Sequence, residues 1–507
     1  MLRRILVWTG AVLLASVVIL LVATAVLLRP EALEARAIAE LSTRLKLDTE
    51  IDDLRVSWFP SPRVRGSGMT MRVPGRPDLP PFMSIERFEV AMGPFSAWRK
   101  QVDTVRLEGL EVNVPPRDAR REMPDRPSGM TESPIIIRHL VSENAMLRFI
   151  PSEPDKTPLT FELLALAIDD LGFTRVMPFQ ARLTNPVPRG LVESSGTVGP
   201  WQPDDPTALP LAGLYTLTNA DLGTINGIGG ILQSEGQYEG LLTEIRATGK
   251  TTTPDFSLNI GGRPLPLETT YVAIIDGTNG TTVLESVDAT LGSSTIKARG
   301  AITNLAGPDG HDIEIASEVI DGRIEDMLAL SIDSPEPLLT GELTSKSTLK
   351  LPPGDTPVRE RLHVEGSFGL GGADFTSATV REKLAELSRR SQGQNEEEAA
   401  KRVLSHLAGD FTLASGVFRA HNLRFLVPGA DIRMAGTYDL GSEALDFEGE
   451  LRMDASASEA MGGVKAILIK PFDFIFRRDG AGAVVPISVK GTWRKPETNL
   501  DWGRIWR

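Results

Sequence analysis

A period of two in the apolar residues recurs along most of the chain, and it limits the possible folds more than any other feature. Its clearest instance runs from Leu445 to Met453, where apolar or glycine positions alternate without error with charged positions. Successive side chains of a β-strand point to opposite faces, so this segment predicts a strand with one apolar and one charged face. Such strands are typical of antiparallel sheets solvated on one side, and doubly wound parallel α/β folds are disfavoured.

The same alternation predicts strands elsewhere. It appears around Met69, Phe88 and Val105, and Gly109 shifts its phase as a β-bulge would. Short glycine-bounded strands follow one another after Gly190, and Asn279-Gly280 indicates a hairpin turn. A closed barrel or a sandwich would show the same alternation, so periodicity alone leaves the choice between open and closed sheets undecided.

Two segments interrupt the β pattern with helical spacing. Ser377–Ser391 places Val380, Leu384 and Leu387 on one helical face, and the charged stretch Asn395–Leu407 is predicted to be a second amphipathic helix. Both are expected to dock on the surface of the sheet.

An uncleaved membrane anchor is predicted at the N-terminus. Ile5–Leu28 carries no charge and would form a helix of about 36 Å, longer than the roughly 30 Å hydrocarbon core of a bilayer. The run exceeds the h-region of a signal peptide, and Arg3 and Arg4 before it favour a cytoplasmic N-terminus. Pro30 then opens a short amphipathic helix with apolar residues at Leu33, Ala37, Leu41 and Leu45.

Composition excludes several classes of function. The chain has 507 residues, a net charge of −13 and no cysteine, so disulfides and thiol chemistry are excluded and nucleic acid is a poor partner. Its five histidines show no metal-ligand spacing, and no nucleophile or phosphate-binding motif occurs. We therefore predict no enzyme, no catalytic residue, no metal and no cofactor.

The segment after Ser456 combines phenylalanines with basic residues. Aromatic rings beside cations suit a membrane interface, where rings lie at headgroup level and cations meet anionic lipid. A C-terminal helix that closes the end of the sheet is an equally good interpretation. The predicted interface residues are Phe472, Phe474, Phe476, Arg477 and Arg478.

Several short motifs, taken in their order along the chain, resemble the AsmA-like family, which is related to the TamB-like proteins and belongs to the repeating β-groove lipid transfer proteins. The motifs that carry the resemblance are Val102–Val112, Gly196–Trp201, Gly249–Phe256, Val427–Ala430, Gly463–Lys465 and Val485–Thr492. Each is a turn or a strand edge of low specificity, and the resemblance spans nearly the whole chain.

The resemblance implies a mainly β fold: an elongated, curled antiparallel sheet forming an open β-groove, with a few peripheral amphipathic helices and one N-terminal transmembrane helix. The expected divisions are a transmembrane anchor (1–29), an N-terminal module (30–115), a linker (116–134), a repeated β-groove body (135–455) and a C-terminal element (456–507).

The family also implies a function. The chain is expected to be a single-pass protein of a bacterial inner membrane, with its bulk in the periplasm. It would shield lipid acyl chains and so contribute to phospholipid transport and outer-membrane homeostasis. A non-enzymatic scaffold or assembly factor for outer-membrane proteins is the alternative. The implied partners are membrane lipids, the inner membrane through the N-terminal helix, and the outer membrane or envelope proteins.

A strand places every second side chain on one side, which selects the residues expected to line the apolar face of the groove. They are Phe88, Val90, Met92, Phe256, Leu258, Ile260, Leu423, Phe425, Val427, Leu445, Phe447, Leu451 and Met453.

Overall fold

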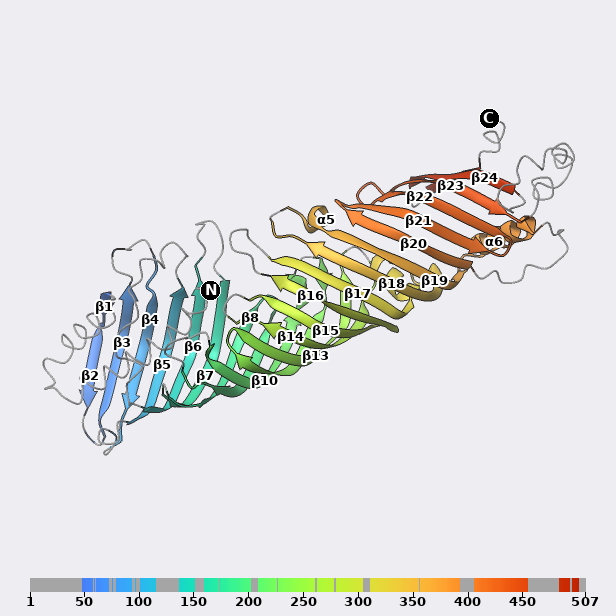
Figure 1. Ribbon diagram of the computed structural model, residues 1–507. Coiled ribbons are helices and arrows are strands. Elements are labelled where there is room, and N and C mark those ends of the chain that lie inside the picture. Colours follow the sequence, from blue (N-terminus) through green and yellow to red (C-terminus); the bar gives the residue numbers. More distant parts are fainter. Residues whose placement is uncertain are drawn as a thin grey trace, which may run out of the picture. The chain divides into compact units, whose positions relative to one another are not determined.

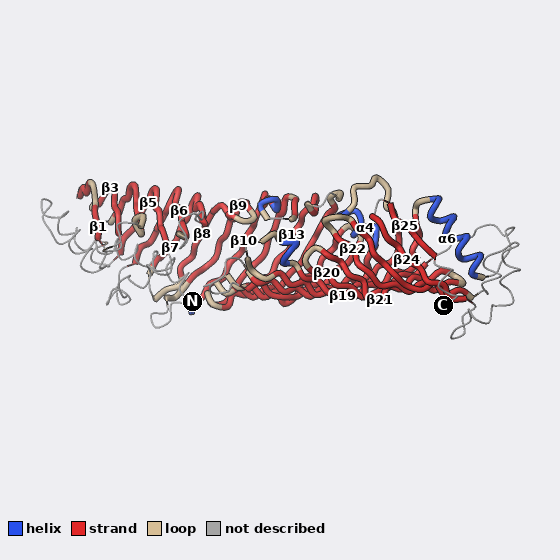
Figure 2. The backbone as a smooth tube through the Cα atoms, turned by 90° about the horizontal axis from the view of Figure 1, so that it is seen from above, coloured by secondary structure: helices blue, strands red, loops and turns tan. Residues whose placement is uncertain are grey.

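The computed structural model describes two compact units built almost entirely of β-strands (Figures 1 and 2). Unit 1 comprises residues up to Thr253 together with Tyr271–Thr282, and unit 2 comprises Pro254–Thr270 and the chain from Val283 onward. The described residues are 48–500 without 58, 60, 73–74, 76–78, 94–95, 97–100, 115–135, 151–158, 173, 202–207, 226, 260–261, 278–279, 304–310, 355, 393–404, 455–482 and 493–494.

Unit 1 is one open sheet in which consecutive strands lie side by side (Figure 1). Both β1 and β2 pair with β3, and each later strand pairs with the next, except that β10 pairs with β12 beside the two-residue β11. The strands are β1 (Asp48–Glu50), β2 (Asp53–Ser57), β3 (Arg63–Arg72), β4 (Met83–Ala91), β5 (Gln101–Val114), β6 (Ile136–Phe149), β7 (Leu159–Leu171), β8 (Met177–Pro186), β9 (Arg189–Val198), β10 (Pro210–Asp221), β11 (Ile228–Gly229) and β12 (Ile231–Leu241). A 3-10 turn, η3 (Leu222–Thr224), follows β10.

Strands β13 (Glu244–Leu258), β14 (Leu265–Ile275) and β15 (Thr282–Leu291) contribute residues to both units. Asn279 of the expected Asn279-Gly280 hairpin lies outside the described residues, and the chain reverses between Asp276 and Thr281. The amide of Asp276 donates to the carbonyl of Thr281, and the amide of Gly280 donates to the carbonyl of Asp276, both at 2.8 Å.

One pair of neighbouring strands in unit 1 is parallel, whereas the sequence predicts an antiparallel sheet. β5 and β6 run parallel, with Gln101 opposite Ile136 and Val114 opposite Phe149. Parallel neighbours need a long crossover, which accounts for a connection as long as 115–135 between them. The expected linker 116–134 lies outside the described residues, and the strands on either side of it pair within unit 1.

The phase shift expected at Gly109 is confirmed. Gly109 has a φ of +64°, a left-handed conformation that glycine adopts without strain. Buried Leu107 and Leu110 on either side of it pair with buried Phe88 and Ile85 of β4. The β4–β5 register is the same before and after Gly109, so no extra residue is inserted here. Both strands change phase together, which keeps apolar residues on one face.

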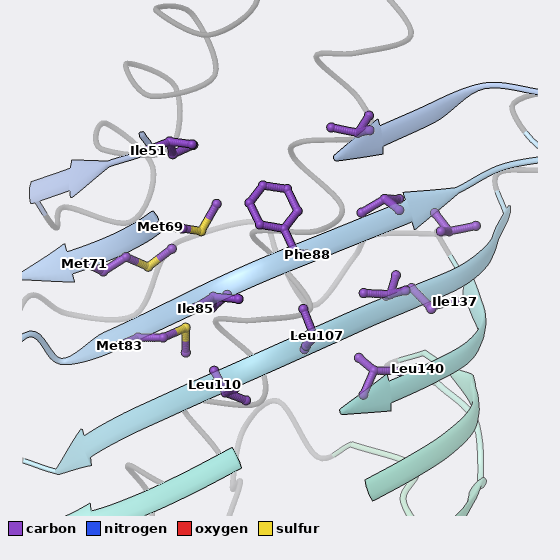
Figure 3. Packing of buried hydrophobic residues seen from close by; sticks show 14 of the residues in the cluster. Ile51, Met69, Met71, Met83, Ile85, Phe88, Leu107, Leu110, Ile137 and Leu140 are labelled. Carbon is purple, nitrogen blue, oxygen red and sulfur yellow. The ribbon is translucent and has the colours of Figure 1, made fainter. Parts of the chain in front are cut away.

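The main core of unit 1 lies on one face of β3 to β6. Figure 3 shows these side chains projecting from neighbouring strands toward the same side of the sheet. Val64, Met71, Val90 and Val105 are no more than 1% exposed. The partly buried side chains packed against this cluster come from the same sheet: Leu54, Val56, Val112, Leu147, Leu163, Ile168 and Leu171.

Unit 2 continues with antiparallel strands, each paired with the next from β16 to β25. The sheet ends at β25, so the described pairings leave it open. The strands are β16 (Ser294–Thr303), β17 (Asp312–Arg323), β18 (Leu339–Leu351), β19 (His363–Phe375), β20 (Ser405–Ala414), β21 (Val417–Val427), β22 (Ala430–Asp439), β23 (Ala444–Met453), β24 (Ala483–Thr492) and β25 (Lys495–Leu500).

In the part of unit 2 that the structure describes, three helices interrupt the sheet: α4 (Ile324–Ser331), α5 (Val358–Arg361) and α6 (Ala378–Ser391). The prediction of a helix over Ser377–Ser391 is confirmed. The second predicted helix, Asn395–Leu407, is wrong at its end, because Ser405–Leu407 begins β20 and pairs with β19. Ser405, expected on an exposed helix, is fully buried and donates to the carbonyl of Ala373 at 3.1 Å.

A nearly buried carboxylate attaches α4 to the β15–β16 turn. Asp326, in the first turn of α4, accepts hydrogen bonds at its Oδ2 from the amide of Ser293 at 3.0 Å and from the hydroxyl of Ser294 at 2.7 Å. The Ser293 hydroxyl donates to the same oxygen at 3.2 Å. Gly292, with a φ of +59°, leaves room for the carboxylate.

We expect Asp326→Ala to lower the free energy of unfolding of unit 2 by about 2–4 kcal/mol, because three donors lose a charged acceptor in a buried site. Urea denaturation of the full chain measures this loss. Asp321→Ala, which removes an exposed carboxylate from the end of β17, should change stability by less than about 0.5 kcal/mol. Equal effects of the two variants would contradict the role of Asp326.

The predicted membrane segments fall outside this description. Ile5–Leu28, the helix after Pro30, and all but the last strands of 456–507 are among the residues left out. Within the described ranges, no helix is long and apolar enough to cross a bilayer.

Candidate functional site

Seven of the predicted lining residues share one face of unit 2. Strand register places Phe425 opposite Ile432, Ile432 opposite Leu451, and Leu451 opposite Val485. Directly opposed residues point to the same side of a sheet. Extending these rows defines the apolar face of unit 2 as Phe368, Phe411, Leu413, Phe418, Leu423, Phe425, Val427, Ile432, Met434, Leu445, Phe447, Leu451, Met453, Val485, Ile487 and Val489.

Helix α6 covers one end of this face. Its Leu384 and Leu387 pack against a cluster that includes buried Val427, Leu451 and Met453. The hydroxyl of Ser388 holds the helix there by donating to the carbonyl of Pro428 at 2.7 Å. Those three predicted lining residues are therefore core beneath a helix rather than accessible surface.

Away from α6 the apolar face is only partly buried. Leu423, Phe425, Leu445 and Phe447 all retain accessible surface. The ring of Phe447 lies on Gly436 of β22, where an added methyl group would stand 2.7 Å from Cγ of the ring. Phe447 thus has one side packed on the sheet and the other available for contact.

Sequence reasoning missed a row of rings on the same face. Phe411 stacks on Phe418 with ring centroids 5.5 Å apart, and it meets Phe368 at 6.2 Å. The signal was present, since Leu407, Gly409, Phe411 and Leu413 alternate with period two. It was obscured by the helix assigned to the residues just before it.

The opposite face of unit 2 is charged. Lys490 of β24 pairs with Asp446 at 3.1 Å and with Glu448 at 3.2 Å. Asp431 accepts from both Arg424 and Arg433, each at 2.9 Å. Partial burial alone would raise the pKa of the Asp431 carboxyl, but its bonds to the two guanidinium groups outweigh burial and hold the pKa below its usual value.

A hollow of about 850 Å³ lies among the charged side chains of β15 to β20. Lys297, Glu318 and Lys346 face one another across it, and Lys346 pairs with Glu318 at 3.0 Å. The lining carries five acidic and three basic side chains, so this surface is strongly polar and suited to water. Among the described residues no group of His, Cys, Asp or Glu could hold a metal ion.

In unit 1 the predicted lining residues Phe88, Val90 and Met92 do share an apolar environment, but they are 5%, 0% and 3% exposed. These three side chains are buried core in the described structure, and their assignment to the lining of a groove stays a prediction. Burial was missed because alternation reports which face a side chain joins, and not whether that face is covered.

The remaining predicted positions are only partly located. Phe256 and Leu258 occupy alternate positions of β13 and are half-buried. Ile260 and the membrane-interface residues Phe472, Phe474, Phe476, Arg477 and Arg478 lie outside the described residues. A comparison with protein-family models finds no match, and no curated protein matches the sequence.

Proposed function

We propose that the apolar face of unit 2 shields lipid acyl chains. The observation that carries the proposal is a contiguous row of partly buried apolar side chains that keep some accessible surface, Phe411, Phe418, Leu423, Phe425 and Phe447, on a sheet whose other face is ion-paired. Apolar patches of this kind mark binding surfaces for apolar partners. No nucleophile or cofactor is needed, so the proposed role is non-enzymatic.

The energetics of lipid transfer make such a face useful. Two acyl chains of about 16 carbons, at roughly 0.8 kcal/mol per methylene, would cost about 25 kcal/mol to expose to water. Contact with apolar side chains replaces contact with other lipids and removes much of this barrier. The headgroup can stay hydrated at the open side.

The AsmA-like resemblance extends this proposal to a cellular setting. Ile5–Leu28 would anchor the chain in a bacterial inner membrane with the body in the periplasm, and the aromatic and basic segment 472–478 would meet a membrane surface. Within that setting the protein would contribute to phospholipid transport and outer-membrane homeostasis.

Site-specific photo-crosslinking tests the proposal. A photoreactive amino acid replaces Phe447 on the apolar face or Glu448 on the charged face of the full-length chain, and crosslinked adducts are identified by mass spectrometry. We expect lipid adducts at position 447 and none above background at 448. Equal labelling at both positions would contradict the proposal. Adducts to an outer-membrane protein at 447 would favour the scaffold alternative.

A further inference from the structure

The apolar face of unit 1 changes its chemistry between β8 and β9. One row across the strands reads Ala181, Ser194, Tyr215, Gly236 and Gly249, and the neighbouring row reads Phe179, Gly196, Gly213, Tyr238 and Ala247. Phe179 packs with the apolar cluster around Met177 and Val198. Beyond it, hydroxyl groups and glycines occupy the positions that apolar side chains hold on the preceding strands.

Three of the chain's four tyrosines gather at this place: Tyr215, Tyr238 and Tyr271. Their rings lie close against glycines. A methyl group at Gly213 would stand 2.9 Å from Cζ of Tyr238, and one at Gly236 would stand 2.8 Å from Cε1 of Tyr215. Glycine is required here by close approach, since any larger residue would lift the rings off the sheet.

The hydroxyl groups form two chains of hydrogen bonds that end on backbone carbonyls. Tyr238 bonds to Ser194 at 2.8 Å, and Ser194 donates to the carbonyl of Leu214 at 2.9 Å. Since a hydroxyl has one proton and a carbonyl can only accept, Tyr238 is the donor to Ser194.

The second chain is longer. Ser234 donates to the carbonyl of Lys250 at 3.1 Å, so Tyr215 donates to Ser234 at 3.0 Å and Tyr271 donates to Tyr215. Burial, reinforced by the bond to Tyr215, raises the pKa of the Tyr271 phenol above its usual value, and burial also raises the pKa of Tyr238. Both groups therefore remain neutral hydroxyls at physiological pH.

The direction of these bonds determines what the cluster offers a ligand. All three tyrosine protons are used within the protein, so the cluster presents oxygen lone pairs. A methylene chain lying over them would desolvate these acceptors without replacing the lost hydrogen bonds, which is unfavourable. A ligand group with an O–H or N–H proton would satisfy them.

We propose that Tyr215, Tyr238 and Tyr271 form a recognition site for the hydrogen-bond donor of a lipid headgroup, an ammonium N–H or a glycerol O–H. The inference rests on the proposed acyl-chain binding and adds a headgroup preference to it. Lipids whose headgroups carry such donors are selected over lipids that carry none. Ethanolamine and glycerol headgroups qualify, whereas choline has neither an N–H nor an O–H group.

Competition among defined lipids tests this preference. The full-length chain in detergent is mixed with equal amounts of phosphatidylethanolamine, phosphatidylglycerol and phosphatidylcholine of identical acyl chains, and retained lipid is quantified by mass spectrometry. We expect phosphatidylethanolamine to be enriched about threefold to tenfold over phosphatidylcholine, the range given by one net hydrogen bond. Enrichment of phosphatidylglycerol as well would show that the cluster recognises any headgroup with an O–H or N–H donor. Enrichment of phosphatidylethanolamine alone would show that it recognises the ammonium group.

Phenylalanine variants distinguish the contribution of the tyrosine hydroxyl groups from that of the aromatic rings. In the triple variant Tyr215→Phe, Tyr238→Phe, Tyr271→Phe the rings still cover the glycines, so total bound lipid should stay within about twofold while the preference disappears. Tyr438→Phe, which removes the fourth tyrosine hydroxyl from β22 in unit 2, should leave the preference intact.

Two outcomes would overturn the inference: equal retention of phosphatidylcholine by the unaltered chain, or a preference that survives in the triple variant. In both cases lipid is still bound, so acyl-chain binding stands. Failure of the unaltered chain to retain any lipid would instead reject the proposed function, and this inference with it.

Discussion

Phe447→Asp is expected to reduce the lipid retained by the full-length chain by at least about tenfold while leaving the sheet folded. Phe447 is partly buried on the apolar face of unit 2 and keeps accessible surface, so a carboxylate there can be hydrated when no lipid is bound. An acyl chain bound there would remove that water without supplying a partner for the charge. A loss of only about 1.4 kcal/mol of binding free energy lowers the affinity for lipid tenfold. Loss of the ring from Gly436 should cost less than the roughly 3–5 kcal/mol typical of a fully buried phenylalanine.

The matched control is Thr437→Asp. Thr437 follows Gly436 on β22, so its side chain joins the charged face, where its neighbours are Arg419 on β21 and Asp446 on β23. We expect this variant to retain lipid as the unaltered chain does. Lipid retention is measured by mass spectrometry and folding by circular dichroism. Outright unfolding of Phe447→Asp would show that Phe447 belongs to a closed core, and normal retention would show that this face does not hold acyl chains.

Val90→Asp should have the opposite outcome and abolish folding of unit 1. Val90 is 0% exposed among other apolar side chains of β3 to β6, and a carboxylate there would have neither water nor a cation. A buried, unpaired charge of this kind is expected to cost more than about 4 kcal/mol, a large part of the stability of a typical domain. Hydrogen exchange should report loss of protection in β3 to β6.

Thr104→Asp provides the comparison for unit 1. Thr104 precedes Val105 on β5, so it points to the other face, where it lies opposite His139 of β6. Protection close to that of the unaltered chain is expected. If Val90→Asp also kept its protection, the apolar face of unit 1 would be accessible to water, and Phe88, Val90 and Met92 would again qualify as lining residues.

The local elements of the fold were largely predictable. Period-two alternation identified β23, the glycine at position 109 identified a change of phase along β5, and a 3.6-residue period identified α6 to within one residue. Each of these signals depends on side-chain direction along a few consecutive residues, which is a property of the backbone geometry itself. The helix expected over Asn395–Leu407 failed at its end because pairing of Ser405–Leu407 with β19 is a long-range contact.

In the candidate site, too, local sequence signals predicted some features and long-range contacts decided the others. Which residues share a face follows from alternation, so Leu423, Phe425, Leu445 and Phe447 could be grouped from the sequence. Whether a face is covered depends on elements distant in the chain. Leu384 of α6 covers Val427 and Met453, while Phe447 keeps accessible surface.

The sequence by itself determined that this protein is mainly β, with one apolar and one charged face per strand, because alternation is set by residues one or two positions apart. Only the tertiary structure decided that β5 and β6 run parallel, that the apolar face of β3 to β6 is core, and that Tyr215, Tyr238 and Tyr271 converge. These three tyrosines are far apart in the chain, and their meeting depends on strand register. Register is a property of paired strands and is set by contacts across the whole sheet.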